Sequence, residues 1–424
     1  MNVTPAPGMV APRGTGSTRG AARNGTAIAA AIAALRVLLG YLVGHVVIST
    51  IGYTKHLTYS LAPSSSWSGL FFRWDARYFV SIAQSGYPPN QPALAPFFPG
   101  YPLLVRALHA LTFGSLTYIV TAEVISAAAF IAAAGLMYAA LRRFISHRQA
   151  MVTVFFFAFF PTSFFFFSPY PESLIILEFV AILYLLDREH FAAATAVAAV
   201  ASLTSLLGVA AAGAVALSWL LARRDLLKAI ASAVLGAMGT LVYMVFLLNR
   251  FGDPILFIHA QKYWHRTVNF PWLATFMNLS SVQRAPSPPA NNTAIPSHTN
   301  YIVVWLMNDA VSVLGLILFI YVAVRVATHL RSGAKNGLDY RRLLPWGILF
   351  LTGLLVPVSS SIHQHESLYD TESTARLISV CVPIYPLTIH LFKRSRLLLA
   401  LLVTGTFISS LGFQLMFNRG FWLT

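Results

Sequence analysis

The chain has 424 residues, of which 57% are hydrophobic and only 10% are charged. A soluble domain carries about 25% charged residues, so the composition excludes a soluble globular protein and predicts a polytopic α-helical membrane protein. The formal net charge is +16, but the basic residues form short clusters between apolar segments, which favours topology-setting charge over a nucleic-acid-binding patch.

In chain order, residues 1–25 predict a disordered cytosolic tail and residues 26–424 predict a single transmembrane domain. Apolar segments of membrane-spanning length follow the tail. They lie at about 28–52, 116–140, 150–168, 172–186, 191–205, 207–222, 227–248, 301–324, 344–359, 375–391 and 397–416. The sequence therefore predicts an all-α bundle of about eleven transmembrane helices.

Basic residues predict the orientation of these helices. A cytosolic N-terminus places most of the 29 lysines and arginines in inner segments, with the largest cluster at 325–342. Merging 191–222 into one helix would move that cluster outside, so the pattern favours a hairpin near Ser205–Gly208. We expect an integral protein of a bacterial inner (plasma) membrane, or of the ER membrane in a eukaryote, with its C-terminus outside.

The predicted outer segments, 53–115, 250–300 and 360–374, are long and rich in aromatic, histidine and acidic residues. The inner loops are short and basic. We therefore expect a catalytic or binding surface that faces away from the cytosol.

The stretch FFRWDARYFVSIAQSGY, residues 71–87, follows the first apolar segment and holds Asp75 between Arg73 and Arg77. A carboxylate is costly to keep near lipid, and one flanked by guanidinium groups is useful for chemistry on lipid-linked substrates. The structural alternative is that Trp74 is an interfacial anchor with incidental charges around it.

Other outer segments supply polar side chains that could meet Asp75. They are Tyr170 and Glu172 in SPYPES, His259, Gln261, Lys262 and Trp264 in FGDPILFIHAQKYWHR, Arg376 in the segment 363–376, and Arg419 in the segment 418–424. Alternatively, the prolines only break helices, the histidines are surface imidazoles, and the arginines snorkel to the interface.

No metal or other cofactor is predicted. His363-Gln364-His365-Glu366 has a spacing seen in metal sites, but one such motif on a loop is weak evidence for zinc. The chain shows no Walker loop, nucleophile elbow or dinucleotide fingerprint in a credible context. The single cysteine, Cys381, excludes an intramolecular disulfide bond.

An outward-facing enzyme without a soluble donor needs a lipid-linked one. A polyprenyl phosphate sugar suits this layout, because its tail lies in the bilayer, cations can hold its phosphate, and an acidic residue can activate an acceptor hydroxyl. The expected partners are that donor, a lipid or glycan acceptor and membrane lipids, without nucleic acid.

Several stretches resemble the PIG-V family: RWDARYFVSIAQSGY, APFFPGYPLLV, FFPTSFFFFSPYPESL, GDPILFIHAQKYWHR and TARLISVCVPIYP. That family comprises the GPI mannosyltransferase II proteins and their prokaryotic relatives, within the GT-C superfamily. The resemblance is collinear over residues 30–424. It implies a GT-C-like helical bundle that transfers mannose from a polyprenyl (dolichyl-type) phosphate, with Asp75 as the catalytic base. Arg77-Tyr78 stands where the family has Glu-His, so the donor sugar need not be mannose.

The expected reaction is a one-step displacement that inverts the anomeric centre. Asp75 takes the acceptor proton, with Glu172 as the second candidate acid. The leaving phosphate needs fixed donors; the candidates are Arg73, His259, Lys262 and Arg376. Trp74, Arg77, Tyr170, Gln261, Trp264 and Arg419 complete the predicted substrate-binding residues.

Two other functional classes are weighed against a transferase. A transporter or lipid flippase should show polar residues through the membrane midplane or a repeated half. Interior ionisable residues are sparse in the sequence, although Glu123, the only acid within 116–140, is expected to face the bundle. A structural scaffold would leave the outer acid–arginine cluster unexplained.

The orientation is testable by labelling. A cysteine placed at Ser287 should react with an impermeant thiol reagent in intact cells, and one at Ser332 should not, after Cys381 has been replaced. The reverse pattern of labelling would contradict the predicted topology.

Overall fold

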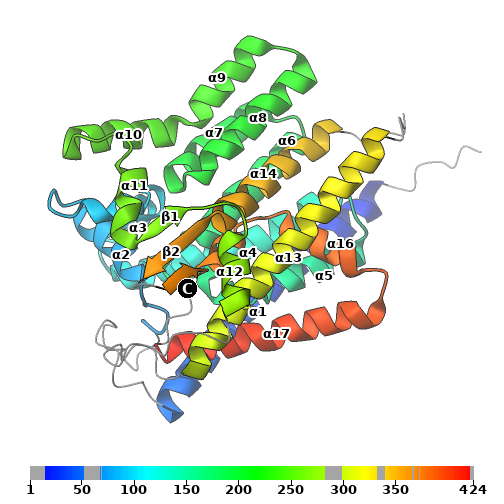
Figure 1. Cartoon of the computed structure of the whole chain (residues 1–424). Coiled ribbons are helices and arrows are strands. Elements are labelled where there is room, and N and C mark those ends of the chain that lie inside the picture. Colours follow the sequence, from blue (N-terminus) through cyan, green and yellow to red (C-terminus); the bar gives the residue numbers. More distant parts are fainter. Residues whose placement is uncertain are drawn as a thin grey trace, which may run out of the picture.

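The computed structural model describes residues 15–51, 67, 69–281, 298–331, 340–364, 367–371 and 373–420 (Figure 1). Seventeen α-helices form most of this part of the chain. They are α1 (Thr15–Thr50), α2 (Ala76–Ser85), α3 (Gly100–Leu111), α4 (Tyr118–Leu141), α5 (His147–Ala158), α6 (Glu172–Asp187), α7 (Phe191–Thr204), α8 (Leu207–Arg223), α9 (Leu226–Gly236), α10 (Met238–Phe251), α11 (Leu256–His259), α12 (Leu273–Ser281), α13 (His298–Arg331), α14 (Tyr340–Val358), α15 (Thr374–Ile378), α16 (Ile384–Phe392) and α17 (Arg396–Asn418). Three short 3-10 turns accompany them: η1 (Pro92–Leu94), η2 (Ser163–Phe166) and η3 (Ala260–Trp264).

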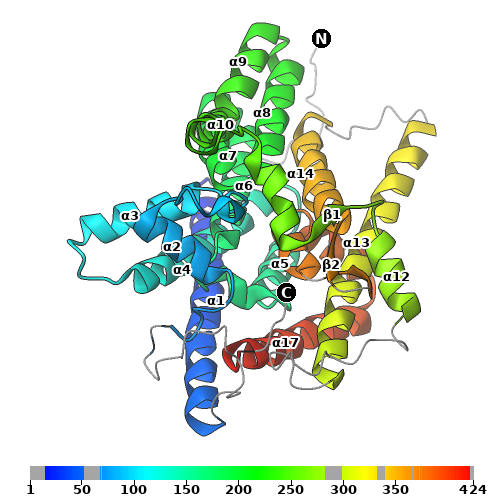
Figure 2. The ribbon, with the colours of Figure 1, turned by 60° about the vertical axis from the view of Figure 1, so that its left-hand side comes forward.

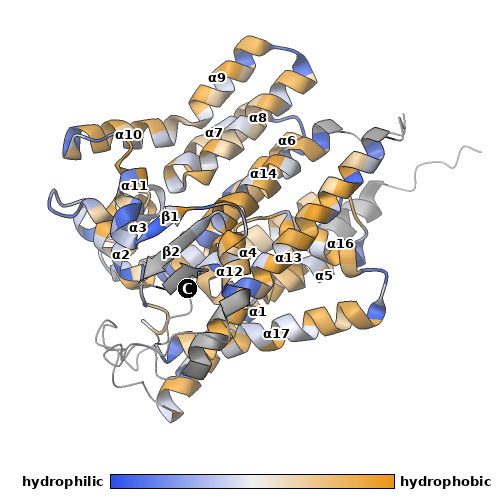
Figure 3. Cartoon of the chain, in the orientation of Figure 1, coloured by the Kyte–Doolittle hydropathy of each residue, from blue (hydrophilic) through white to orange (hydrophobic). Residues whose placement is uncertain are grey.

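Four of the described helices are long and apolar enough to cross a membrane: α4, α17, and the apolar parts of α1 and α13. The pair α9 and α10 adds a fifth candidate span that is bent by 47°. Hydrophobic residues make up much of these helices (Figure 3). The expectation of a helical chain with long apolar segments is therefore confirmed.

The prediction of eleven continuous spans is wrong at several places. The segment 150–168 is broken, because α5 ends at Ala158 and Pro161 and the turn η2 follow; proline resists continuing a helix. The segment 375–391 is likewise divided into α15 and α16, and Pro383 begins the second piece. Helices α7, α8 and α14 are apolar but shorter than the four long ones.

The expected disordered tail is also wrong in part. Helix α1 begins at Thr15, so the segment from Thr15 to 25 is helical. Residues 1–14 lie outside the described part of the chain.

The predicted hairpin near Ser205–Gly208 is confirmed, since α7 ends at Thr204 and α8 begins at Leu207. Gly208 is required there by close packing. A Cβ atom at this position would lie 2.2 Å from the carbonyl carbon of Ala201.

Helix α6 has charged residues at both ends. Glu172 begins the helix and Asp187 ends it, about 22 Å away at the usual rise per residue. The Asp187 carboxylate lies 2.6 Å from Arg143 and 3.9 Å from Arg342. Residues predicted to be inside thus gather at one end of α6, and Glu172 lies at the other.

A small sheet lies outside the helical expectation. Strands β1 (Arg266–Val268), β2 (Ser360–Gln364) and β3 (Ser367–Asp370) pair antiparallel in that order, with Thr267 opposite Ser361. It joins two of the segments predicted to lie outside (Figure 1).

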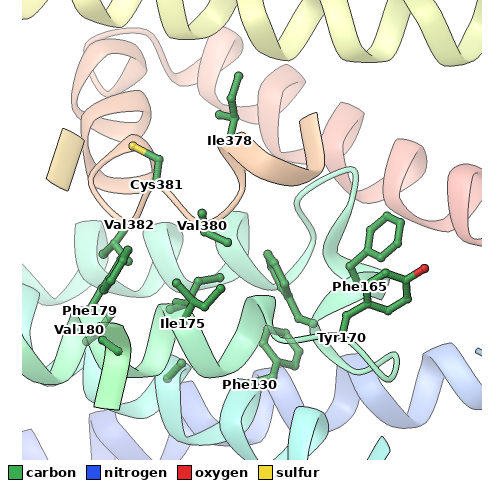
Figure 4. Packing of buried hydrophobic residues seen from close by; sticks show 14 of the residues in the cluster. Phe130, Phe165, Tyr170, Ile175, Phe179, Val180, Ile378, Val380, Cys381 and Val382 are labelled. Carbon is green, nitrogen blue, oxygen red and sulfur yellow. The ribbon is translucent and has the colours of Figure 1, made fainter. Parts of the chain in front are cut away.

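The segment that follows α15 packs against α6. Val380 and Val382 face Ile175 and Phe179, and Cys381 is buried beside them (Figure 4). This apolar layer holds the broken pair α15 and α16 close to the start of α6.

A buried guanidinium ties α1 to α17. Arg36 is fully buried near the middle of the α1 span; its Nη1 donates to Gln414 Oε1 at 2.7 Å and its Nε donates to Ser163 Oγ at 3.3 Å. The end of α17 that carries Gln414 lies beside α1 (Figure 2). This ionisable group inside a candidate span therefore has defined partners from two other segments.

The hairpin packing gives a stability prediction. Gly208→Ala should lower the free energy of unfolding by about 1–3 kcal/mol, because the added methyl group meets the α7 backbone. Gly213→Ala is the control on the same helix: its Cβ meets nothing within 4 Å, so alanine should stabilise α8 by up to about 1 kcal/mol. Thermal unfolding in one detergent compares them, and equal effects would contradict the close packing.

Candidate active site

The Arg376 guanidinium lies between two carboxylates. Its Nη1 donates to Asp75 Oδ2 at 2.9 Å, and its Nε lies 3.3 Å from Glu172 Oε1. The side chains of Arg376, Glu172 and Asp75 are 9%, 6% and 16% exposed. Three of the predicted site residues, from α15, the start of α6 and the start of α2, thus form one buried cluster, which we call the Arg376 cluster.

The side chain of Asp75 does not cap the helix that it precedes. It is the N-cap residue of α2, yet its carboxylate makes no capping hydrogen bond to that helix. Asp225, the N-cap of α9, shows the ordinary arrangement and accepts from Lys228 N–H at 3.0 Å. The Asp75 carboxylate is directed to Arg376 instead, which is typical of a functional position.

Unusual backbone angles precede both charged partners. Trp74, just before Asp75, has φ +51°, and Ser373, the N-cap of the helix that carries Arg376, has φ +68°. Residues other than glycine rarely adopt this left-handed region, and a bulky one such as Trp74 does so only when the surrounding structure enforces it. Both turns therefore depend on packing from other elements.

Aromatic rings enclose the guanidinium. The Arg376 guanidinium carbon lies 5.4 Å from the ring centres of Phe165 and Tyr170. These two rings meet edge to face beside the start of α6 (Figure 4). The Tyr170 hydroxyl donates to the carbonyl oxygen of Arg73 at 2.8 Å, and burial raises the pKa of Tyr170 well above its usual value, so this donor keeps its proton.

A hydroxyl network fixes the SPYPES segment on α4. Ser126 Oγ donates to the carbonyl of Tyr170 at 2.9 Å, and Ser173 Oγ donates to the carbonyl of Ser126 at 2.9 Å. The Tyr101 hydroxyl, from the FFPGYP segment, lies 2.8 Å from Ser126 Oγ. Ser126 thus joins the proline-rich segments FFPGYP and SPYPES. Pro171 in the second segment is the N-cap residue of α6.

Arg73 supports the turn before Asp75. The side chain is buried, and its Nη1 donates to the carbonyls of Gly69 and Phe72 at 3.0 and 2.8 Å. Glu123 on α4 is buried, attracts Arg73 and hydrogen-bonds Tyr41. Glu123 faces the bundle as expected.

Three predicted substrate-binding residues have local contacts instead of joining the Arg376 cluster. His259 Nδ1 lies 2.6 Å from Asp253 Oδ2, and this hydrogen bond lowers the pKa of Asp253. Gln261 Nε2 is 3.4 Å from the carbonyl of Phe257, and the Lys262 ammonium lies over the ring of Tyr263.

Trp264 and Arg77 both contact Tyr78 on α2. The Trp264 ring packs against Tyr78 and Phe97, with ring centres 5.1 and 5.4 Å away, and its Nε1 donates to a carbonyl of η1. Arg77 Nη2 donates to the Tyr78 hydroxyl at 2.6 Å. Tyr78, three residues after Asp75, thus links these two predicted residues.

Arg419 lies at the end of α17, beside the turn that leads to Arg73. It is the C-cap residue, and the preceding Asn418 donates from Nδ2 to the carbonyl of Leu70 at 3.0 Å. The sequence did not predict the contact between the Phe165 ring and the Arg376 guanidinium, because nothing in a run of phenylalanines marks the ring that contacts a cation.

The charges of the cluster sum to −1 when both carboxylates are ionised. No group of three or more histidine, cysteine, aspartate or glutamate side chains gathers within the described residues; the side chains of 363–366 lie outside them. The arrangement offers a carboxylate to accept a proton and a guanidinium to stabilise an anion.

No protein-family model matches the chain, and no curated protein matches it.

The cluster gives a second stability prediction. Arg376→Leu should lower the free energy of unfolding by about 3–5 kcal/mol, because Asp75 and Glu172 lose the cation that offsets part of their negative charge in a buried site. Arg77→Leu is the control and should cost about 1 kcal/mol or less, since it removes only a half-exposed contact with Tyr78. Equal losses in denaturant unfolding would mean that the buried cation does not offset the charge of the two acids.

Proposed function

We propose that this protein is an integral-membrane glycosyltransferase that moves a sugar, mannose or a related hexose, from a polyprenyl phosphate to a lipid-linked or glycan acceptor on the outer side of the membrane. The resemblance to the PIG-V family and the GT-C superfamily supports this proposal, together with the long apolar helices. We place the reaction at the Arg376 cluster.

One observation carries the proposal: Arg376 Nη1 lies 2.9 Å from Asp75 Oδ2 across 301 residues of sequence. The resemblance to the PIG-V family nominated Asp75 as the base, and the sequence nominated Arg376 as a phosphate ligand. A transferase of this kind needs both groups within one site, because the proton acceptor serves the oxygen that attacks the anomeric carbon and the guanidinium serves the phosphate that leaves the same carbon.

The proposed chemistry is a single displacement. Asp75 accepts the proton of an acceptor hydroxyl, and the oxygen attacks the anomeric carbon from the side opposite the phosphate. The bond from that carbon to the phosphate oxygen breaks, the electron pair stays on the phosphate, and the configuration inverts. Arg376 stabilises the charge that develops on the leaving group.

In this proposal Arg376 serves two partners in turn. A phosphate that binds its Nη1 competes with the Asp75 carboxylate, so donor binding weakens the ion pair and leaves Asp75 freer to take a proton. Glu172 keeps the guanidinium in place through Nε during the exchange. Arg73 supports the Asp75 turn and has no direct contact with phosphate in this scheme.

A transporter or lipid flippase is the second candidate, favoured by one feature of the fold. Arg36, Glu123, Glu178 and Asp309 are all buried inside helices, and ionisable groups within membrane helices often mark transport pathways. Purified protein in liposomes that moves a labelled polyprenyl lipid between leaflets, without transferring its sugar, would support this class instead.

The transferase is tested with purified protein, radiolabelled polyprenyl-phosphate mannose and envelope lipids as acceptor. The wild-type protein should move label to the acceptor, and Asp75→Asn should reduce turnover by about a hundredfold or more, because the amide cannot take the proton. Both proteins should be expressed and folded, so that the loss of turnover reports on the chemistry and not on unfolding.

The matched control is Asp225→Asn. Asp225 is also an N-cap aspartate with a basic partner, Lys228 at 2.9 Å, but it begins α9, and its side chain caps that helix. This variant should transfer label at the wild-type rate. An active Asp75→Asn protein would overturn the assignment of the base, and a wild type that transfers no label would count against the proposed activity.

A further inference from the structure

Helix α15, which carries Arg376, does not cap its own N-terminus. The helix has only five residues, and its N-cap Ser373 makes no capping hydrogen bond through its side chain. Serine is among the favoured capping residues, but here its backbone is left-handed. A helix of one turn is not stable by itself, so the position of Arg376 must be set by other elements.

Asn308 on α13 supplies the missing cap. Its Oδ1 accepts from the backbone N–H of Ala375, the residue before Arg376, at 2.9 Å across 67 residues of sequence. The Asn308 side chain is fully buried, and its Nδ2 donates to the carbonyl of Val304 at 3.1 Å, which fixes the orientation of the amide. The cap therefore comes from α13, a long helix that supplies neither of the two acids of the Arg376 cluster.

A second contact holds the approach to α15. Thr371 Oγ1 donates to Asp309 Oδ1 at 3.1 Å and accepts from Asn278 Nδ2 at 2.9 Å. All three side chains are buried. Asn308 and Asp309 lie in the apolar span of α13, where polar groups are costly. These hydrogen bonds end on one another, on Val304 and on Ala375, and the proposed chemistry does not use them directly.

Helix α13 is already joined to α12 without these contacts. Trp272 Nε1 donates to the carbonyl of Ser312 at 3.0 Å, and Thr275 Oγ1 lies 2.6 Å from Ser312 Oγ. Attachment of α13 to α12 therefore does not explain Asn308 and Asp309, which lie one turn before Ser312. Asn308 and Asp309 each make a hydrogen bond that ends on the segment 371–375.

We propose that Asn308 is a positioning residue, which fixes the start of α15 so that Arg376 reaches Asp75 and Glu172 together. Two contacts, at 2.9 and 3.3 Å, have to be met by one guanidinium. A displacement of about 1 Å can cost a hundredfold in rate when groups must be aligned. The rate effect rests on the proposed transferase function, but the effect on the ion pair does not.

The experiment uses three variants of the full chain. Asn308→Leu removes the acceptor at nearly constant volume, Asn308→Asp keeps an acceptor oxygen, and Asn308→Gln keeps the amide but moves it by one methylene group. Ser312→Ala is the matched control, because it removes an equally buried hydrogen bond of α13 that ends on α12 instead of α15.

The first readout is coupling to the ion pair, measured by unfolding temperature alone. Asp75→Asn should lower the unfolding temperature, because it weakens the contact with Arg376. In the Asn308→Leu background this loss should shrink by half or more, because the contact is already misaligned. In the Ser312→Ala background the loss should be unchanged. Additive losses in both backgrounds would overturn the proposal. If Asn308→Leu does not fold, Asn308→Gln takes its place in the cycle with the same expectation.

The second readout is transfer of label from polyprenyl-phosphate mannose. Asn308→Leu or Asn308→Gln should lower kcat tenfold or more with little change in the acceptor KM, and Asn308→Asp, which keeps the acceptor oxygen but loses the donor to Val304, should lower kcat less than Asn308→Leu. Ser312→Ala should keep the wild-type kcat. Equal losses for Asn308→Leu and Ser312→Ala would make Asn308 a general packing residue. If the wild type transfers nothing, the proposed function fails, and the coupling measurement still decides the positioning role.

Discussion

The buried charge of Arg376 is the constraint on which the rest of the site depends. A guanidinium taken out of water is stable only where acids and hydrogen-bond acceptors surround it. Asp75 and Glu172 supply the acids, from two helix starts that are remote in the sequence. The helices α2, α6 and α15 therefore have to meet at one point, and the aromatic rings of Phe165 and Tyr170 close the space around it.

Several residues around this point depart from ordinary local backbone and capping preferences, and contacts with residues remote in the sequence stabilise them. Trp74 and Ser373 have left-handed backbones, Asp75 does not cap its helix, and α15 is too short to stand alone. The compensation comes from Tyr170, which holds the Arg73 carbonyl, and from Asn308, which caps α15. Such conflicts between local preference and tertiary structure are expected at functional sites.

The resting cluster also bears on how an anionic substrate would bind. With two carboxylates on one guanidinium, its net charge does not by itself attract a phosphate. A phosphate ester has to displace a carboxylate from Arg376, and Asp75 is the more exposed of the two partners. In the proposed transferase this exchange links donor binding to release of the base, which would limit proton transfer in the absence of donor.

The sequence by itself determined the chain's helical, apolar character, the hairpin at Ser205–Gly208, and Asp75, Glu172, Tyr170 and Arg376 as residues of interest. These follow from composition, the positive-inside rule and the cost of polar groups beside lipid, all of which act locally along the chain. The number of continuous spans was overestimated, because an apolar run looks the same whether the helix is straight or broken.

Only the tertiary structure decided which polar residues meet. The pairing of Arg376 with Asp75 spans 301 residues, and the cap from Asn308 spans 67. No periodicity in the sequence encodes such contacts, since they depend on how whole helices dock. For the same reason the sequence expected His259, Gln261 and Lys262 to join the site, whereas docking of their segment on α2 leaves them with local partners and brings Trp264 to Tyr78.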